Sequence, residues 1–548
     1  MKSQSTAKKR IILAAIVLAA AFACVCFAAS MNTHPTPPII IAADETPQQC
    51  FAEATRLLSI GKSTPRAIAL LKRALKSQPN NIDYHEALAS AYTYRASVIY
   101  RALYFRSMIE TGRSQYPTNL MQWEWRRVTK QSFPYDSRPV EQAYHLIHFK
   151  DDGTPFFMSD DKASAEIVSL VRQANSEWII AEQEARSPAA QGYAHYGHAW
   201  TDRVFGRSDN DLYTGDMKNM AQKYKALLAL PSEADAENEI ADATRLDPKN
   251  PAYWQAAGDL APYQSDQSAY ANSARPGTAA LPSSNKYYLQ SLKLQPKNEQ
   301  LWLKVAADDT RNFKAAESAD EGAISANPRN AYSLLMCATY ILKQSHYEQN
   351  SMNSPDPDHA KIDAQMVASL NPDDLAAVGR VQKLVHQAAA ANAMDVSHYE
   401  PKSPPLLRRA LDMPILSVDE FEFGNWGSLR DGARDMCGVA IGQALHKDPE
   451  SGVRLMSDLA AAVQPKFTAD NFTKQAVKSN DIMTTFVCEA VQQIALHEKE
   501  KLCAQYCSRE EADEAAKERS AARALFNVNR RKVQRYFTIT NDDIFQFY

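Results

Sequence analysis

The stretch Gln295-Pro296-Lys297-Asn298, followed at once by the apolar segment that contains Trp302, decides the fold. Proline has no N–H and disfavours helical geometry in the residue before it, so one helix ends there. The asparagine two places later can accept a hydrogen bond from the first free N–H groups of the next helix. These four residues therefore indicate the end of one helix and the start of another.

The same phrase recurs along the chain, which predicts a series of stacked helical hairpins. Its other copies are Gln78-Pro79-Asn80-Asn81, Asp247-Pro248-Lys249-Asn250, Asn327-Pro328-Arg329-Asn330 and, more loosely, Asn371-Pro372-Asp373-Asp374. The composition agrees, because the 548 residues include only 17 glycines where proteins typically contain about 7%. We expect an all-α protein.

A second pattern places large and small apolar residues at regular positions before and after the prolines. Its members are Trp254 and Gly258 after Pro248, Trp302 and Ala306 after Pro296, and Ala316 and Ala323 before Pro328. This pattern resembles the tetratricopeptide repeat, which has W-x2-L-G-x2-Y, then A-x3-F, then P over about 34 residues. The resemblance implies a TPR-like solenoid of helical hairpins whose concave surface binds proteins or peptides.

The repeats are degenerate and interrupted. Asp309 stands where the pattern has Tyr, and Asp320 stands where it has Phe. The sequence His195-Tyr196-Gly197-His198 is similar to the small-residue position of a further repeat helix. We predict a TPR-like repeat over 49–94, an irregular, aromatic-rich helical insertion over 95–230, TPR-like repeats over 231–345, a linker and degenerate repeat over 346–403, and a C-terminal helical region over 404–548.

The N-terminal segment is predicted to direct export. Lys8-Lys9-Arg10 precede an uncharged apolar run over 11–29, and a proline-rich linker follows over 32–48. Such a run is typical of an export signal, and it is just long enough to span a bilayer. Residues 1–31 are therefore a signal peptide cleaved near Ser30 or a retained membrane anchor, with lipidation at Cys24 as a third alternative. We expect an extracytoplasmic protein, in the periplasm or cell envelope, that is secreted or membrane-anchored.

The charge argues against nucleic acid as a partner. The formal net charge is −3, and it becomes −7 when the four basic residues of 1–31 are subtracted. Nucleic-acid binding needs a basic face. A local exception is the segment 517–535, which is basic and amphipathic. It fits either a solvated helix face or a contact with anionic lipid or an acidic partner.

The eight cysteines are too sparse for a disulfide scaffold. One or two bridges remain possible in an oxidising compartment, with Cys488, Cys503 and Cys507 as the candidates. The alternative for Cys503 and Cys507, which lie four residues apart, is burial as small apolar residues in a helix seam.

Two His-x2-His pairs, His145/His148 and His195/His198, are the candidate metal ligands. Residues three apart share a helix face, and Asp202 lies one turn beyond His198. A structural metal site needs four converging ligands, so we expect neither a metal nor a cofactor. The alternative is an extracytoplasmic enzyme or metal-binding protein with its site in 95–230.

The function predicted from the sequence is therefore a non-enzymatic scaffold that binds a protein or peptide partner. Its first helices, over 82–95, 251–261, 299–309 and 331–343, are expected to line the binding surface. Tyr84, His85 and Asn330 are the candidate partner-binding residues. A membrane contact through residues 11–29 is expected if that segment is retained.

Overall fold

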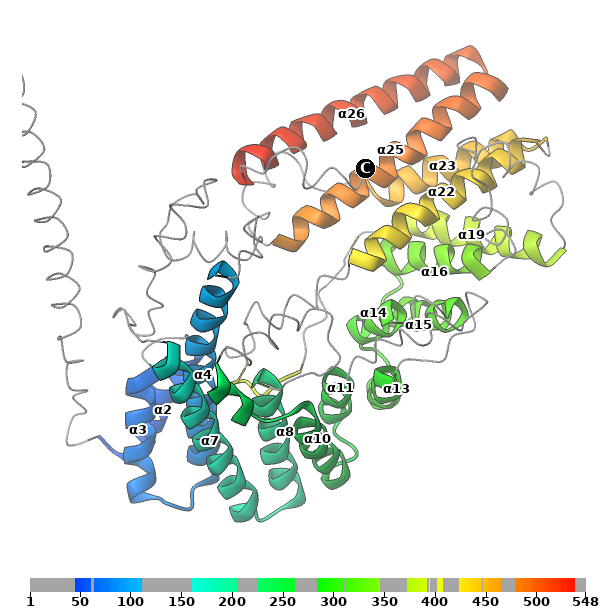
Figure 1. Ribbon diagram of the computed structural model, residues 1–548. Helices are drawn as coiled ribbons and strands as arrows, with labels where there is room; N and C mark the ends of the chain where they lie inside the picture. The colour runs from blue at the N-terminus through cyan, green and yellow to red at the C-terminus, as the bar shows by residue number, and fades with distance from the viewer. Residues whose placement is uncertain are drawn as a thin grey trace, which may run out of the picture. The chain divides into compact units, whose positions relative to one another are not determined.

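The computed structural model describes residues 45–60, 64–110, 160–205, 224–261, 283–308, 312–344, 372–391, 394, 402–407, 423–445, 447–464 and 479–537. These ranges fold almost entirely into α-helices, and no β-strand occurs among them (Figure 1). The prediction of an all-α fold is confirmed. None of the described helices is both long enough and apolar enough to cross a membrane.

The chain divides into two compact units, and the boundary falls within one helix, after Glu239. The helices of unit 1 are α2 (Pro47–Ser59), α3 (Thr64–Ser77), α4 (Ile82–Glu110), α7 (Asp160–Glu184), α8 (Pro188–Phe205), the 3₁₀-helix η1 (Lys225–Ala229) and the first part of α10 (Glu233–Leu246). Within this unit α2 pairs with α3, α4 with α7, and α7 with α8.

Unit 2 contains the second part of α10 and the helices that follow it. These are α11 (Pro251–Leu260), α13 (Ser283–Leu294), α14 (Glu299–Asp308), α15 (Phe313–Ala326), α16 (Ala331–Gln344), α19 (Pro372–Ala390), α22 (Phe423–Leu445), α23 (Pro449–Ala462), α25 (Ser479–Tyr506) and α26 (Arg509–Phe537). Each helix from α11 onward packs on the described helix that follows it, with one exception. Helix α22 has α16, rather than α19, as its main earlier neighbour. The fold is therefore a series of helical hairpins.

The Pro-x-Asn phrases form the turns between these helices, as predicted. Each asparagine accepts a hydrogen bond from an N–H of the next helix. The pairs are Asn81 with Tyr84 (3.3 Å), Asn250 with Ala252 (3.1 Å), Asn298 with Leu301 (3.2 Å) and Asn330 with Tyr332 (3.1 Å). The looser phrase at Pro372 behaves differently, because Pro372 is itself the first residue of α19.

A ring N–H closes three of these turns from the other side. The indole nitrogens of Trp254 and Trp302 donate to the carbonyl oxygens of Pro248 (2.8 Å) and Pro296 (2.9 Å), six residues earlier. At the corresponding place in the first turn, Nε2 of His85 lies 2.6 Å from the carbonyl oxygen of Pro79. His85 thus occupies the repeat position that tryptophan holds elsewhere.

The predicted insertion over 95–230 is more regular than expected where the structure describes it. Helix α4 continues through residue 94 as far as Glu110, and α7 and α8 form a hairpin joined by residues 185–187. Gly197 is the close-approach point of this hairpin, since an added Cβ would lie 2.2 Å from Cη2 of Trp178. The resemblance of Gly197 to the small repeat position is therefore real. Residues 111–159 and 206–223 of the predicted insertion lie outside the described residues.

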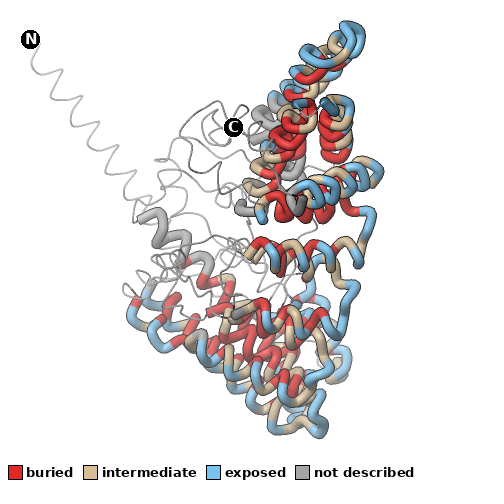
Figure 2. Tube along the Cα trace, turned by 90° about the vertical axis from the view of Figure 1, so that its right-hand side faces the viewer, coloured by how far each residue is buried: buried red, intermediate tan, exposed pale blue. Residues whose placement is uncertain are grey.

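Helix α16 is buried along almost its whole length, from Ala331 to Leu342. It packs against α15, α19 and α22, and it belongs to the large core cluster that continues through α22, α23 and α25. Buried residues recur in this way along the helices of both units, with exposed residues on their outer sides (Figure 2). Residues 331–343 therefore do not line an open surface as predicted, because a helix that is apolar on all sides is buried.

The six described cysteines are all free thiols, so the possible bridges among Cys488, Cys503 and Cys507 are not present in this structure. Cys503 is buried in the seam between α25 and α26, while Cys507 is half-buried at its end. Burial, and then the hydrogen bond with Cys507, raises the pKa of Cys503 to about 11. The alternative of packing in a helix seam therefore describes Cys503.

Candidate functional site

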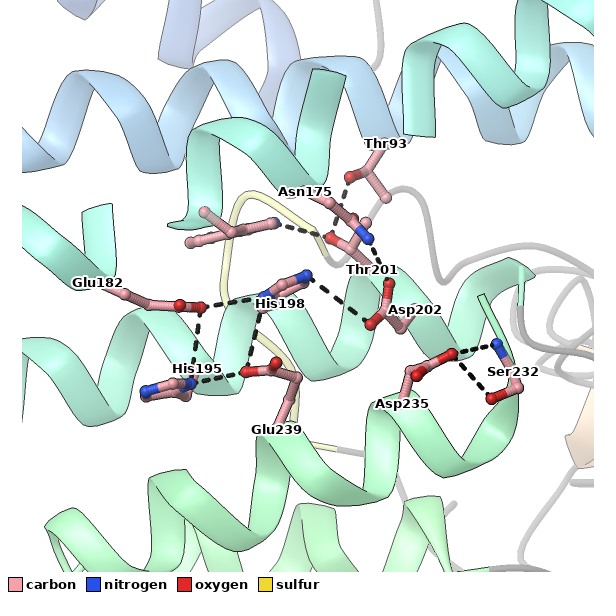
Figure 3. Close-up of polar contacts among 11 residues, drawn as sticks. Thr93, Asn175, Glu182, His195, His198, Thr201, Asp202, Ser232, Asp235 and Glu239 are labelled. Atoms are coloured by element: carbon pink, nitrogen blue, oxygen red, sulfur yellow. Dashed lines mark hydrogen bonds and ion pairs between the residues drawn. The ribbon is translucent and has the colours of Figure 1, made fainter. Parts of the chain in front are cut away.

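Two histidines and two glutamates from three helices of unit 1 meet beside the α7–α8 hairpin (Figure 3). Glu182 comes from α7, His195 and His198 from α8, and Glu239 from α10. We call this group the histidine–glutamate cluster. Its side chains are 7% to 24% exposed, so it is a largely buried polar site.

Local sequence positions these side chains. Ser187 accepts a hydrogen bond from the N–H of Ala190 (3.2 Å), and Pro188 follows it as the first residue of α8. Proline is well suited to that place because it has the φ angle of a helix and no N–H to leave unpaired. At the start of α10, the carboxylate of Asp235 accepts hydrogen bonds from the N–H and hydroxyl of Ser232, both at 2.8 Å.

The Nδ1 atoms of both histidines point at the two glutamates. Nδ1 of His195 lies 2.6 Å from Oε2 of Glu239 and 3.6 Å from Oε1 of Glu182. Nδ1 of His198 lies 3.0 Å from Oε1 of Glu182 and 3.5 Å from Oε2 of Glu239. Nδ1 of each histidine therefore faces one oxygen atom of each glutamate.

A second layer of polar residues holds His198 from its other side. Nε2 of His198 faces Oδ2 of Asp202 at 3.8 Å, and Oδ1 of Asp202 accepts a hydrogen bond from the Asn175 side chain at 2.8 Å. One residue earlier, the hydroxyl of Thr201 accepts a hydrogen bond from the indole of Trp178 at 2.9 Å. These contacts fix α8 against α7 and hold Asp202 in place.

The carboxylates tune the protonation of the cluster. Burial lowers the pKa of His198, but its hydrogen bond with Glu182 and the charges of Asp202 and Glu239 outweigh burial, so the pKa is raised. Burial raises the pKa of Asp202 to about 6, against the opposing effects of His198 and Asn175. The carboxylates therefore favour a cation at the position of His198.

The three predicted partner-binding residues lie inside the fold. Tyr84, His85 and Asn330 are 4%, 6% and 0% exposed. Tyr84 packs against Phe51, and the amide of Asn330 donates to Glu299 at 2.7 Å. None of the three has the exposure that contact with a partner requires.

His85 is a buried structural histidine. Its Nε2 faces the Pro79 carbonyl, and its Nδ1 lies 2.5 Å from Oε2 of Glu177. Both neighbours are hydrogen-bond acceptors, which favours the imidazolium because only that form has two N–H donors. Burial lowers the pKa of His85, but Glu177 and the carbonyl of Pro79 outweigh burial and raise it.

The structure brings His195, His198 and Asp202 together as the sequence pattern anticipates. His145 and His148 lie outside the described residues. Sequence reasoning missed Glu182 and Glu239, because they come from other helices, 16 and 44 residues from their histidine partners. No short motif relates residues at such separations, and only the packing of α7, α8 and α10 joins them.

Comparisons with known proteins leave the family open. No protein-family model matches the chain, and no curated protein matches it. Among solved structures the chain is similar to yeast Tom70, at 13% sequence identity over 84% of this chain and 92% of that chain, with a TM-score of 0.15. At that score the two chains do not superpose as wholes, so the description of this fold as TPR-like rests on its own turns and hairpins.

Proposed function

We propose that this protein is an exported, membrane-tethered scaffold that binds other proteins and has no catalytic activity of its own. The observation that supports the proposal is the succession of helical hairpins, most of which pack on the helices before and after them in the chain. Stacked hairpins of this kind present long helical surfaces to solvent, and such surfaces are suited to binding proteins or peptides.

The exposed surface that we assign to the partner is the outer face of α26. Ala515 on this helix is buried, whereas Leu525 and Val528 are 38% and 43% exposed. Lys517 and Arg531 are exposed as well and share the face of Leu525 and Val528 by helical spacing. We call Lys517, Leu525, Val528 and Arg531 the α26 outer face. Because it combines positive charge with apolar side chains, it suits a partner whose surface is acidic and partly apolar.

Tethering is supported by the N-terminal sequence, which lies outside the described residues. A basic flank at residues 8–10 precedes the apolar run over 11–29. Such a run is long enough to span a bilayer, and the basic flank favours a cytoplasmic N-terminus. The helical units would then lie on the opposite side of the membrane.

The test is cross-linking followed by affinity purification of the tagged full-length protein from its native membranes. We expect one or a few partners to be enriched by the wild type and lost in the double variant Leu525→Glu/Val528→Glu. The matched control is Leu375→Glu on α19, where the leucine is 58% exposed, and this variant should retain the partners. If the α26 variant retains every partner, the outer face is not the binding surface. If the wild type enriches no specific partner, the scaffold proposal is contradicted.

Lipid binding is tested in parallel, because an amphipathic basic helix also binds anionic membranes. Sedimentation of the protein lacking residues 1–31 with phosphatidylserine vesicles should show no more binding than with phosphatidylcholine vesicles. Binding to the anionic vesicles that the α26 variant abolishes would assign the outer face to lipid and overturn its assignment to a protein partner.

A further inference from the structure

We propose that the histidine–glutamate cluster binds one divalent first-row transition-metal ion, such as Zn²⁺, as a structural site of unit 1. This inference is independent of the scaffold function, since none of the cluster residues belongs to the α26 outer face. It assigns a ligand to buried polar groups that the scaffold function does not use.

The donor atoms are of the types that bind such an ion, and their spacing is close to the one that it requires. Imidazole nitrogen and carboxylate oxygen are both ligands of Zn²⁺, with bonds of about 2.0–2.2 Å, so two donors on one tetrahedral ion lie about 3.3–3.6 Å apart. The four nitrogen–oxygen distances in the cluster are 2.6, 3.0, 3.5 and 3.6 Å. One ligand atom from each of Glu182, His198 and Glu239 lies within 4.8 Å of the others. These three donors thus face a common point, and Nδ1 of His195, which lies 2.6 Å from Glu239 and 3.6 Å from Glu182, would complete the set after a side-chain adjustment.

The second layer has the arrangement typical of a metal-bound histidine. A histidine that ligates a metal through one ring nitrogen usually directs the other at a carboxylate or carbonyl, which fixes the tautomer and the ring orientation. His198 presents Nδ1 to the glutamates and Nε2 to Asp202. Asp202 is in turn held by Asn175. Two histidines on an exposed helix surface would not require a buried carboxylate behind them.

The charge of the site also favours a cation. Three carboxylates, from Glu182, Asp202 and Glu239, lie within 3.8 Å of the two imidazoles. Burying carboxylates is costly unless a positive charge compensates them. Protonation of the imidazoles would compensate these charges in part, whereas a divalent ion would do so while leaving both imidazoles neutral. Binding therefore displaces protons, and the affinity should rise with pH.

The placement of the ligands indicates a structural role. They come from α7, α8 and α10, and residues 206–223 separate α8 from η1 and α10 in the sequence. An ion bound by all four would join three helices. Because four protein ligands fill a tetrahedral site, no position remains open for a substrate or a reactive water.

The experiment uses the untagged full-length protein in detergent, treated with a chelator and titrated with Zn²⁺ alone by calorimetry. We expect one equivalent to bind and the midpoint of thermal unfolding to rise with Zn²⁺ concentration, because a ligand that binds only the folded state stabilises it. Replacement by Co²⁺ should give the visible absorption of a four-coordinate ion. The expected affinity loss is more than 100-fold for His198→Asn or Glu239→Gln, and about 10- to 100-fold for Asp202→Asn.

The matched control is His386→Gln. Nδ1 of His386 lies 3.0 Å from a single carboxylate, that of Asp458, on the exposed surface, so this variant should bind Zn²⁺ like the wild type. The double variant His145→Asn/His148→Asn should do the same. Glu239→Gln changes a half-buried residue without changing its shape, so it answers the question even if His198→Asn fails to fold. No stoichiometric binding by the wild type, or unchanged affinity in folded Glu239→Gln and Asp202→Asn, would overturn the proposal.

Discussion

Asp320 shows how one residue can depart from a repeat pattern and remain inside the fold. It occupies the place where the tetratricopeptide pattern has phenylalanine, and it is 1% exposed on α15. Its Oδ2 atom has no hydrogen-bond partner among the described residues. Burial, and then the charge of Glu317, holds the pKa of Asp320 well above its usual range. The folded state therefore favours the neutral carboxylic acid.

This pKa predicts a pH-dependent cost that Asp320→Asn removes. Below the unfolded pKa of about 3.9 the residue is protonated in both states. Above it, folding takes up a proton. The free energy of unfolding of the wild type therefore falls by about 1.4 kcal/mol per pH unit relative to that of the variant, until the pKa of Asp320 in the folded state is reached. Urea unfolding at pH 5 and pH 7 should show the advantage of the variant growing with pH.

The control for Asp320 is Asp431→Asn on α22, whose side chain is 49% exposed. Replacing this exposed carboxylate should not reproduce the pH-dependent advantage of Asp320→Asn. Parallel pH profiles for Asp320→Asn and the wild type would show that the Asp320 carboxyl has an ordinary pKa in the folded state.

At the scale of the elements, close helix pairing depends on glycine at a few contacts. Helices α11 and α13 approach at Gly258, where an added Cβ would lie 2.2 Å from Cε1 of Tyr288. The ring of Tyr288 is buried, and its hydroxyl donates to Asp259 at 2.9 Å. The ring of Tyr288 is therefore enclosed by its neighbours and fixed at its hydroxyl, so it has little room to move away from an added Cβ.

We predict that Gly258→Ala destabilises the protein by about 1–3 kcal/mol, since overpacking forces shifts in the neighbouring residues. Gly379→Ala is the matched control. It also replaces a helical glycine, but among the described residues no atom outside the surrounding backbone of α19 lies within 4 Å of the added Cβ. The higher helix propensity of alanine should therefore stabilise α19 by about 0.5–1 kcal/mol. Chemical denaturation of both variants measures the difference. Equal effects of the two substitutions would contradict the packing argument.

At the scale of the whole molecule, the sequence predicts the turns far better than the site. Proline and asparagine act on neighbouring residues, so the ends of α3, α13 and α15 could be located from the phrase alone. Gly197 was likewise visible as a small repeat position. The partners of His195 and His198 were not, because Glu182 and Glu239 reach them only through tertiary packing. The burial of α16 could have been predicted, because residues 331–342 are almost all apolar around the whole helix, and a helix of that kind is buried.

The enclosure of α16 has a consequence for the way unit 2 opens. A stack in which every hairpin contacts only its neighbours can lose hairpins one at a time from its ends. Helix α16 interrupts this, because α15, α19 and α22 all pack on it. Exposing its amides requires these helices to separate together.

Native-state hydrogen exchange should therefore find that the amides of α16 exchange more slowly than those of α11 and α14, with a free energy of opening close to that of global unfolding. Exchange in α16 as fast as in α11 would mean that the hairpins open singly. If α16 is the slowest helix, the C-terminal part of the chain is one cooperative block, and a substitution anywhere around α16 weakens all of it.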